Sequence, residues 1–295
     1  MRAHFSPCPN GPSLSFATTG NARIIGTRLL TALLLALGLA LTGCSSDDDK
    51  FSVLPDTPVD TLYNDGLNAL ITGDSELAVK LFDEVERQYP YSKWATRAQL
   101  MAAYAYYRSD KYDESIAALD RFIELHPAHE DITYAHYLKA ICYYEQISDV
   151  ERDQSMTKLA LASLEVVVER WPQTSYARDA GLKLDLTRDH LAGKHMSIGR
   201  FYQKREEYLP AINRFKTVVD SYQTTTHVPE ALLRLVESYT ALGLTQEARA
   251  MTEVLGYNYP GTEWYADAYE LVTGVQVDYP GADKGEGNWF TSLFN

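Results

Sequence analysis

Apolar residues recur along the chain in a stripe with the spacing of one helix face. In five segments, a small residue is followed four positions later by a larger side chain and three positions further on by an apolar one. The small residues are Ala78, Ser115, Ala160, Ala211 and Ala248. Offsets of four and seven lie on one side of an α-helix. The stripe therefore predicts five amphipathic helices, each with a small residue that lets the preceding antiparallel helix approach closely.

Each of these helices has a predicted end. Twelve residues after the small residue stands a proline in four segments, at Pro90, Pro127, Pro172 and Pro260, and Gln223 in the fifth. Proline cannot continue a helix because it lacks a backbone N–H and its ring clashes with the preceding turn. Hydroxyl side chains that can cap the next helix follow at Ser92, Thr174, Ser175 and Thr262.

This arrangement resembles the tetratricopeptide repeat, whose helix pairs show the same small residue, aromatic residue and terminal proline. Gly66, Ala103 and Gly199 stand where that family places a small residue in its first helix. The resemblance covers about residues 58–274. It implies an all-α fold, an α-solenoid of five tetratricopeptide-like helix pairs over 59–273 that includes a closing helix near its end.

Two intervals are longer than the usual repeat of about 34 residues. The extra residues of the first lie near 147–154, which predicts a charged loop between two helices. Those of the second lengthen a first helix to about 175–205, and some thirty residues at 1.5 Å each give a helix of about 45 Å. We expect this helix to divide the solenoid into an N-terminal half, 59–173, and a C-terminal half, 174–273.

The N-terminus carries a lipoprotein signal. Two arginines precede a thirteen-residue apolar run, 29–41, which is too short to cross a bilayer comfortably and fits a signal-peptide core. It ends in Leu41-Thr42-Gly43-Cys44, which resembles the bacterial lipobox, so we expect removal of 1–43 and lipidation of Cys44. Residues 44–58 form a predicted polar tether, and Ser45 favours sorting to the outer membrane. An ordinary transmembrane anchor is the alternative.

Composition narrows the functional classes. The full chain has a net charge of −13, and because residues 1–43 hold three arginines and no acid, the remainder carries −16. Such a surface repels phosphate backbones, so no nucleic-acid partner is expected. The 21 tyrosines suit half-buried surfaces such as those between stacked helices. Besides Cys8 and Cys44 only Cys142 remains, so we expect no disulfide framework and a small buried hydrophobe at that position.

Motifs for catalysis or metal binding are weak. His126, His129 and His136 are spaced three and seven residues apart across a turn, without a cysteine or carboxylate cluster to complete a ligand set. His190 and His195 do not share a helix face well. We found no glycine-rich phosphate loop, nucleophile elbow or paired zinc-protease motif. The sequence therefore predicts neither an enzyme nor a protein with a cofactor or metal.

Tyrosines on the predicted first helices are the candidate binding residues. Those helices line the concave side of a solenoid. The tyrosines on them are Tyr63, Tyr104, Tyr107, Tyr137 and Tyr144. They either pack between neighbouring helices or face the groove, where their rings and hydroxyls could hold an extended peptide. Cations that could steer a peptide carboxylate, or simply be solvated, are Lys93, Arg97, Arg108 and Lys139.

Three stretches resemble more closely the BamD (ComL) family of β-barrel assembly lipoproteins. They are Tyr89-Pro90-Tyr91-Ser92 with Ala102-Ala103-Tyr104, Arg121-Phe122-Ile123 with Tyr134-Ala135-His136-Tyr137, and the segment from Cys142 to Gln154. The match continues through Asp189-His190-Leu191-Ala192 to Ala211-Ile212-Asn213-Arg214. The resemblance implies that N-terminal repeats bind the targeting signal of unfolded outer-membrane proteins. It also implies that C-terminal repeats bind the POTRA region of the barrel subunit BamA.

The same resemblance implies site residues and further partners. The residues expected to contact client peptides are Tyr63, Arg97, Tyr104 and Tyr137. Those expected at the BamA interface are Asn213 and Arg214, since a guanidinium can pair bidentately with an acidic partner. The implied protein is non-catalytic, lies on the periplasmic face of the outer membrane, and works beside other assembly lipoproteins.

Some positions depart from the repeat pattern. Gln223 replaces a proline and Thr252 interrupts the stripe. Residues 274–295 lie beyond the repeats, and we expect a flexible tail whose aromatic end is a candidate docking peptide. The alternative function is a periplasmic scaffold of the cell-division or envelope-constriction machinery, which would share the repeats without needing a lipobox. A cell-wall lyase or hydrolase would need a lysozyme-like domain, for which no residues remain.

Overall fold

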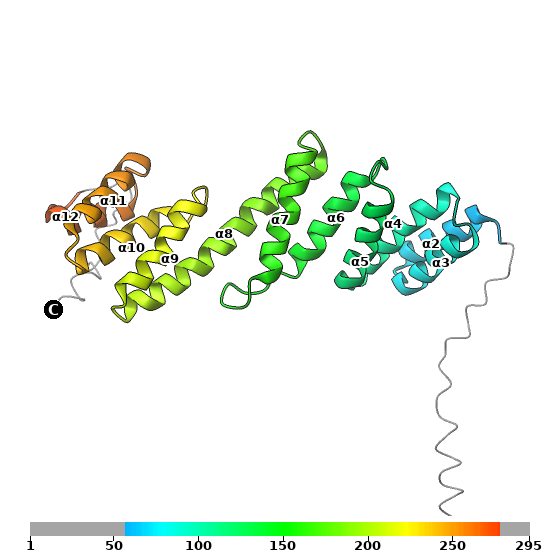
Figure 1. Ribbon diagram of the computed structural model, residues 1–295, viewed down its shortest axis with the longest axis horizontal. Coiled ribbons are helices and arrows are strands. Elements are labelled where there is room, and N and C mark those ends of the chain that lie inside the picture. The colour runs from blue at the N-terminus through cyan, green and yellow to red at the C-terminus, as the bar shows by residue number, and fades with distance from the viewer. Residues whose placement is uncertain (1–56, 278–295) are drawn as a thin grey trace, which may run out of the picture. The chain divides into compact units, whose positions relative to one another are not determined.

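A computed structural model describes residues 57–277 of the protein (Figure 1). The predicted signal peptide, Cys44, most of the tether and residues 278–295 of the tail lie outside the described residues. Within the described range the chain forms eleven α-helices and no strand. None of these helices is long and apolar enough to cross a membrane.

The helices form five antiparallel pairs and a final single helix. Their bounds are α2 Val59–Thr72, α3 Ser75–Gln88, α4 Lys93–Arg108, α5 Tyr112–Leu125, α6 Ile132–Glu145, α7 Ser155–Arg170, α8 Ser175–Lys204, α9 Tyr208–Ser221, α10 Val228–Ala241, α11 Thr245–Asn258 and α12 Glu263–Thr273. Each first helix packs against its own second helix and against the second helix of the pair before it. The predicted α-solenoid of five pairs plus a closing helix is therefore confirmed.

The small residues of the stripe lie where the two helices of a pair meet. All five are at most 1% exposed. On the first helices, a Cβ built on Gly66 would lie 2.7 Å from the Phe82 ring, and one on Gly199 only 2.4 Å from the Phe215 ring. Ser115 Oγ donates a hydrogen bond to the Ala103 carbonyl at 2.8 Å. The pairs therefore repeat one packing device, in which a residue without a large side chain makes room for a ring or a neighbouring backbone.

Helix ends follow the predicted signals with one difference. The hydroxyls of Ser92, Thr174 and Thr262 accept hydrogen bonds from the backbone N–H three residues later. Ser175, which the sequence also offered as a cap, is instead the first residue inside α8. The reason is local, because Thr174 has the extended backbone of a cap and already satisfies the free N–H of the first turn.

The long helix α8 joins the two sets of pairs (Figure 1). At 30 residues it is about twice as long as the other helices. Its neighbours are α6 and α7 on one side and α9 and α10 on the other. The preceding loop, which connects α6 to α7, contains the extra residues 147–154 expected from the sequence. Both length predictions are confirmed.

Two buried side chains, one in the stripe and one on a first helix, are accommodated by hydrogen bonds. Thr252, which interrupts the apolar pattern, is buried, and its hydroxyl donates to the Ala248 carbonyl one turn earlier at 3.0 Å. Cys142 is fully buried among apolar residues, with its Sγ 3.3 Å from Ser115 Oγ. Burial raises the pKa of the Cys142 thiol to about 11. This side chain is therefore the small, unreactive hydrophobe that was predicted.

Candidate polypeptide-binding site

The first helices of successive pairs contact one another in the order α2, α4, α6, α8 and α10. These helices carry a set of tyrosines, half-buried except for the exposed Tyr176, which we call the tyrosine surface. It consists of Tyr63, Tyr104, Tyr107, Tyr134, Tyr137, Tyr144 and Tyr176. The partial exposure of these rings shows that they take part in packing and also remain accessible to solvent. Packing between helices is therefore seen for these side chains, and peptide binding by their exposed parts stays a prediction.

At the N-terminal end of this surface, Tyr63 joins α2 to α4. Its ring centroid lies 4.9 Å from that of Trp94 and 5.5 Å from that of Phe82. Burial raises the pKa of the Tyr63 phenol, and the nearby Arg97 guanidinium partly offsets this rise. Arg97 is exposed and only 3.9 Å from a Glu130 carboxylate oxygen, a weak pairing at the surface. The structure therefore places two of the predicted client-contact residues next to each other.

The centre of the tyrosine surface is formed by α4, α6 and α8. The Tyr176 ring of α8 lies 5.5 Å from Tyr134 and 5.2 Å from Tyr137 of α6. Burial raises the pKa of Tyr134, and the phenols of Tyr104 and Tyr107 on α4 add to this rise. Tilted ring pairs at such distances contribute about 0.5–1.5 kcal/mol beyond the area that they bury. Ring contacts therefore link α6 to α8.

One hydrogen-bonded group fixes a ring of this surface. The Tyr137 hydroxyl donates to Asp179 Oδ2 at 2.6 Å, and Lys183 Nζ donates to both Asp179 oxygens at 2.8 and 3.0 Å. Lys183 Nζ also lies 5.8 Å from the Tyr144 ring centroid. The Lys183 ammonium, followed by the Tyr137 hydroxyl, lowers the pKa of Asp179. Because the Tyr137 hydroxyl is engaged, its ring is the part available to a ligand.

Sequence reasoning missed four of these residues. Tyr134 was quoted only for the family resemblance, and Tyr176, Asp179 and Lys183 lie in the N-terminal half of α8, where no binding residue was predicted. A signal was present, since Tyr176, Asp179 and Lys183 are spaced three and four residues apart and share one helix face. One of the cations predicted to steer a peptide carboxylate already has a partner in the structure. Lys139 is paired with Asp120 at 2.5 Å.

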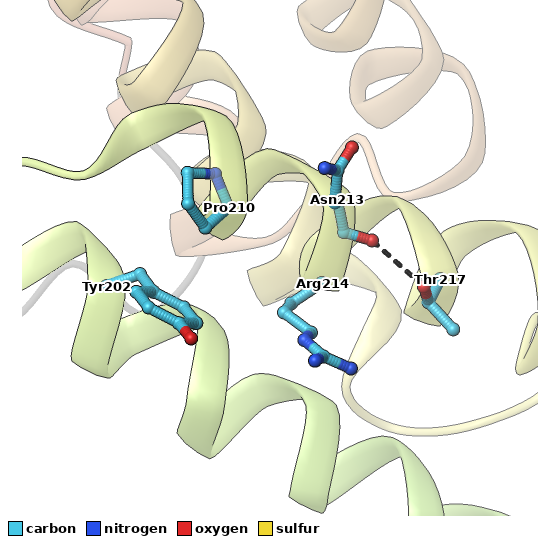
Figure 2. A pocket seen from close by; sticks show the side chains of 5 residues that line it. All are labelled: Tyr202, Pro210, Asn213, Arg214 and Thr217. Atoms are coloured by element: carbon cyan, nitrogen blue, oxygen red, sulfur yellow. Dashed lines mark hydrogen bonds between the residues drawn. The ribbon is translucent and has the colours of Figure 1, made fainter.

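The two predicted partner-interface residues line a small pocket between α8 and α9 (Figure 2). The pocket has a volume of about 220 Å³, and Tyr202, Pro210 and Thr217 complete its lining. Asn213 is exposed, whereas Arg214 is half-buried and has no carboxylate partner among the residues that the structure describes. Burial, followed by the charge of Arg214, lowers the pKa of His195. An unpaired guanidinium in a pocket is suited to an acidic side chain of a partner.

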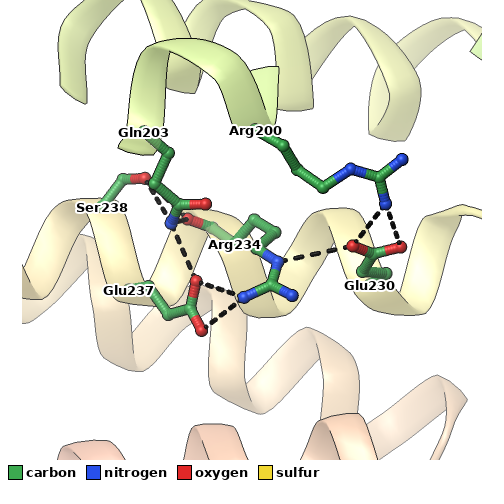
Figure 3. A network of polar contacts seen from close by, with 6 residues as sticks. All are labelled: Arg200, Gln203, Glu230, Arg234, Glu237 and Ser238. Atoms are coloured by element: carbon green, nitrogen blue, oxygen red, sulfur yellow. Dashed lines mark hydrogen bonds and ion pairs between the residues drawn. The ribbon is translucent and has the colours of Figure 1, made fainter. Parts of the chain in front are cut away.

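A network of charges connects α8 to α10 (Figure 3). Arg200 pairs bidentately with Glu230 at 2.8 and 3.0 Å, and Arg234 lies 3.4 Å from the same carboxylate. Arg234 also pairs with Glu237 at 2.9 and 3.0 Å, and Gln203 donates to Glu237 at 2.8 Å. Burial nevertheless raises the pKa of Glu237. Sequence reasoning missed this network, although Glu230, Arg234 and Glu237 are spaced four and three residues apart on α10, and only the pairing with α8 needed the tertiary structure.

The histidines considered as metal ligands have structural contacts instead. His126 Nε2 lies 3.1 Å from Gln99 Oε1, and the His136 ring stacks on Trp171 with centroids 5.0 Å apart. His129 does come close to two acids: its ligand atom and those of Glu130 and Asp131 lie within 4.8 Å of one another. However, His129 Nδ1 already accepts a hydrogen bond from the Asp131 backbone at 3.1 Å. The three predicted histidines therefore do not converge on one point.

Helix pairs that stack on one another in sequence order define a tetratricopeptide-like α-solenoid. The sequence profile of the YfiO family, described as outer membrane lipoprotein, matches residues 55–255. The chain therefore belongs to the YfiO family of outer membrane lipoproteins.

Curated relatives agree with this assignment. The chain is 51% identical over 244 residues to the outer membrane protein assembly factor BamD of Caulobacter vibrioides, covering 82% of this chain and 79% of the relative. It is 49% identical over 250 residues to BamD of Rickettsia prowazekii, covering 85% and 98%. Among solved structures, the TPR2AB domain of yeast Sti1 aligns over 72% of this chain and 81% of that one, at 12% identity and a TM-score of 0.39.

Proposed function

We propose that this protein is a non-catalytic component of the machinery that assembles β-barrel proteins in the outer membrane. It binds unfolded outer-membrane proteins and the POTRA region of a BamA-type barrel subunit, and a lipid on Cys44 holds it at the periplasmic face. The observation that carries the proposal is the identity of 51% over 244 residues and of 49% over 250 residues to two BamD proteins.

The tyrosine surface supports client binding. Unfolded strands of outer-membrane barrels alternate apolar and polar residues and are rich in aromatic residues near the membrane interfaces. Partly or fully exposed rings on α4, α6 and α8 offer apolar faces to such side chains, and Arg97 and Arg108 on α4 are exposed. Binding by ring faces tolerates many sequences, because every aromatic or aliphatic side chain can pack on a ring. A receptor for many different clients needs this tolerance.

The Arg214 pocket supports binding of the barrel subunit. It lies on the side of α8 that faces the second helix α9, away from the tyrosine surface on the first helices. Client and partner can therefore bind at the same time. The occupant of the pocket is expected to present a carboxylate to Arg214 and a hydrogen-bonding group to Asn213.

Co-purification tests the partner. A tagged full-length chain, extracted from membranes in mild detergent, is expected to recover a large outer-membrane barrel protein with POTRA domains, identified by mass spectrometry. Arg214→Glu is expected to abolish this recovery through charge repulsion. Lys216→Glu, which reverses an exposed charge two residues away on the same helix, is the matched control and is expected to retain it.

Two results would contradict the proposal. Recovery of division or peptidoglycan proteins without the barrel subunit would support a division scaffold instead. Normal levels of folded outer-membrane barrels after depletion of this protein would show that it is not needed for their assembly.

A further inference from the structure

The double length of α8 leaves part of its surface without a helical neighbour. A helix turns by about 100° per residue, so positions three, four and seven apart share a face. Arg200 and Gln203, near its C-terminal end, contact α10. The same face continues towards the N-terminus through Leu186 and Leu182, where α10 does not reach. These leucines are 60% and 69% exposed.

A pocket of about 770 Å³ lies along this part of α8. The α8 residues in its lining are Leu186, Asp189, His190, Gly193, Ser197 and Arg200. The loop residues 149–152 form one side, and His227 at the start of α10 forms the other. We call this feature the α8 groove. The exposed Leu186 lies at one end of the groove, and the polar side chains of Ser197 and Arg200 lie at the other.

The two sides of the α8 groove are held in place by hydrogen bonds to one stretch of helix. Asp189 accepts hydrogen bonds from the Thr226 backbone N–H at 3.0 Å and from its hydroxyl at 2.7 Å. Lys194 Nζ donates to the Glu151 carbonyl at 2.7 Å. Between them, a Cβ on Gly193 would lie 3.2 Å from His227 Nε2. The glycine therefore lets the loop before α10 close onto α8, and the groove is built into the fold.

The α8 groove begins about one turn beyond Lys183, whose ammonium lies over the Tyr144 ring of the tyrosine surface. Asp179 and Lys183, which fix the Tyr137 ring, are seven and three residues before Leu186 and lie on the adjoining face of the same helix. A chain that leaves the rings of α6 towards the C-terminal pairs therefore meets Leu186 next. No ion pair engages the carboxylate of Glu151 or the guanidinium of Arg152 at the rim among the described residues.

We propose that the α8 groove is a second binding site for the same extended client chain whose first site is the tyrosine surface. This inference rests on the proposed function. From Leu186 to Arg200 the helix rises by about 21 Å, which about six residues in an extended conformation would span. The occupant is an unfolded segment with an apolar side chain at the Leu186 end. Polar side chains and free backbone groups of this segment follow at the end with Ser197 and Arg200. The Glu151 and Arg152 side chains at the rim can pair with a client charge of either sign.

Peptides of two lengths test the inference with the full-length chain in detergent. The short peptide is a ten-residue C-terminal segment of an outer-membrane barrel, and the long one extends it by eight residues of the same barrel. The tyrosine surface alone accounts for binding of the short peptide. The long peptide is expected to bind about tenfold more tightly, measured by fluorescence anisotropy.

Leu186→Glu is expected to remove the tenfold gain and leave the affinity for the short peptide unchanged. The side chain is exposed, so the fold tolerates the change. Leu125→Glu is the matched control, since this leucine at the end of α5 is 58% exposed and lies outside the groove. It is expected to alter neither affinity.

The outcomes separate the two proposals. If the short peptide binds and lengthening brings no gain, or if Leu186→Glu and Leu125→Glu act alike, the α8 groove is not a client site and the proposed function stands. If neither peptide binds the unaltered chain, client binding by the tyrosine surface fails, and the inference fails with it.

Discussion

The first helices of the N-terminal and C-terminal pairs have the same packing but different chemistry on their shared side. Between α6 and α8, ring contacts are made by tyrosines that stay partly exposed. Between α8 and α10, they are made by charged groups, with Arg234 and both of its glutamate partners largely buried. Rings can accept a ligand without losing their own contacts, whereas a buried charge network is specific to one geometry.

This difference teaches that one scaffold can be adaptable at one end and fixed at the other. A surface that receives many clients benefits from contacts without strict direction. A region that presents a pocket to one permanent partner benefits from a network that holds α8 and α10 in one arrangement. The experiments below probe each side of this comparison, from the largest expected effect to the smallest.

Removal of Arg234 is expected to have the largest effect. Arg234→Ala leaves the Glu237 carboxylate with only Gln203, in a site where burial already disfavours its charge. Breaking a buried ion pair from one side costs about 3–5 kcal/mol of folding free energy. Urea unfolding of the full-length chain measures the loss. Arg249→Ala, at an exposed position of α11, is the control and is expected to stay within about 0.5 kcal/mol. Equal losses would show that the network does not stabilise the fold.

Glycines test whether the two regions share one packing device. Gly199→Ala and Gly66→Ala are each expected to lower stability by about 1–3 kcal/mol, because the new Cβ would overlap the rings of Phe215 and Phe82. Gly181→Ala, in α8 with no atom within 4 Å of the new Cβ, is expected to raise stability by about 0.5–1 kcal/mol. Thermal unfolding checks all three. If all three substitutions stabilised the protein, Gly66 and Gly199 would not lie at tightly packed contacts between paired helices.

Variants of Tyr137 test binding by ring faces. Tyr137→Ala is expected to weaken client-peptide binding about tenfold, equivalent to about 1.4 kcal/mol. Tyr137→Phe keeps the ring, and because the lost hydroxyl is engaged by Asp179 rather than free, binding is expected to change by no more than about twofold. Isothermal titration calorimetry distinguishes the two. A tenfold loss in Tyr137→Phe would mean that the hydroxyl itself, or its hold on the ring, determines affinity.

Acidification is expected to have the smallest effect and to act on both regions. Burial lowers the folded-state pKa of His136, near α7, and of His195, on α8, below the ordinary value of 6.5. The unfolded chain then binds more protons, so stability is full above pH 6.5 and falls as the pH drops through the lowered pKa values. Urea unfolding between pH 7.5 and 5.5 measures this loss. His195→Gln and His136→Gln should each flatten the dependence, and an unchanged slope in both would contradict the assignment.

Much of the fold could be predicted because its signals are local. The stripe that begins at Ala78 and ends at Pro90 describes one helix and its end, and the four similar segments describe the others. The thirty-residue helix followed from counting residues between Pro172 and the next stripe. The family assignment, made first from short matching stretches, is confirmed. The roles of Tyr63, Arg97, Tyr104 and Tyr137, of Asn213 and Arg214, and of lipidated Cys44 stay predictions, as does the division of the solenoid near residue 173.

The amino-acid sequence by itself determined the helices, their pairing and their order, because helix periodicity, small residues and terminal prolines act within some forty residues of chain. Only the tertiary structure decided which side chains meet across pairs. Tyr137 finds Asp179, Arg200 finds Glu230, and two distant loops reach the same turn of α8 around Gly193. These contacts depend on how far each first helix extends past its neighbours and how it is rotated about its axis. Both are set by the packing of all the helices together, and no short pattern records them.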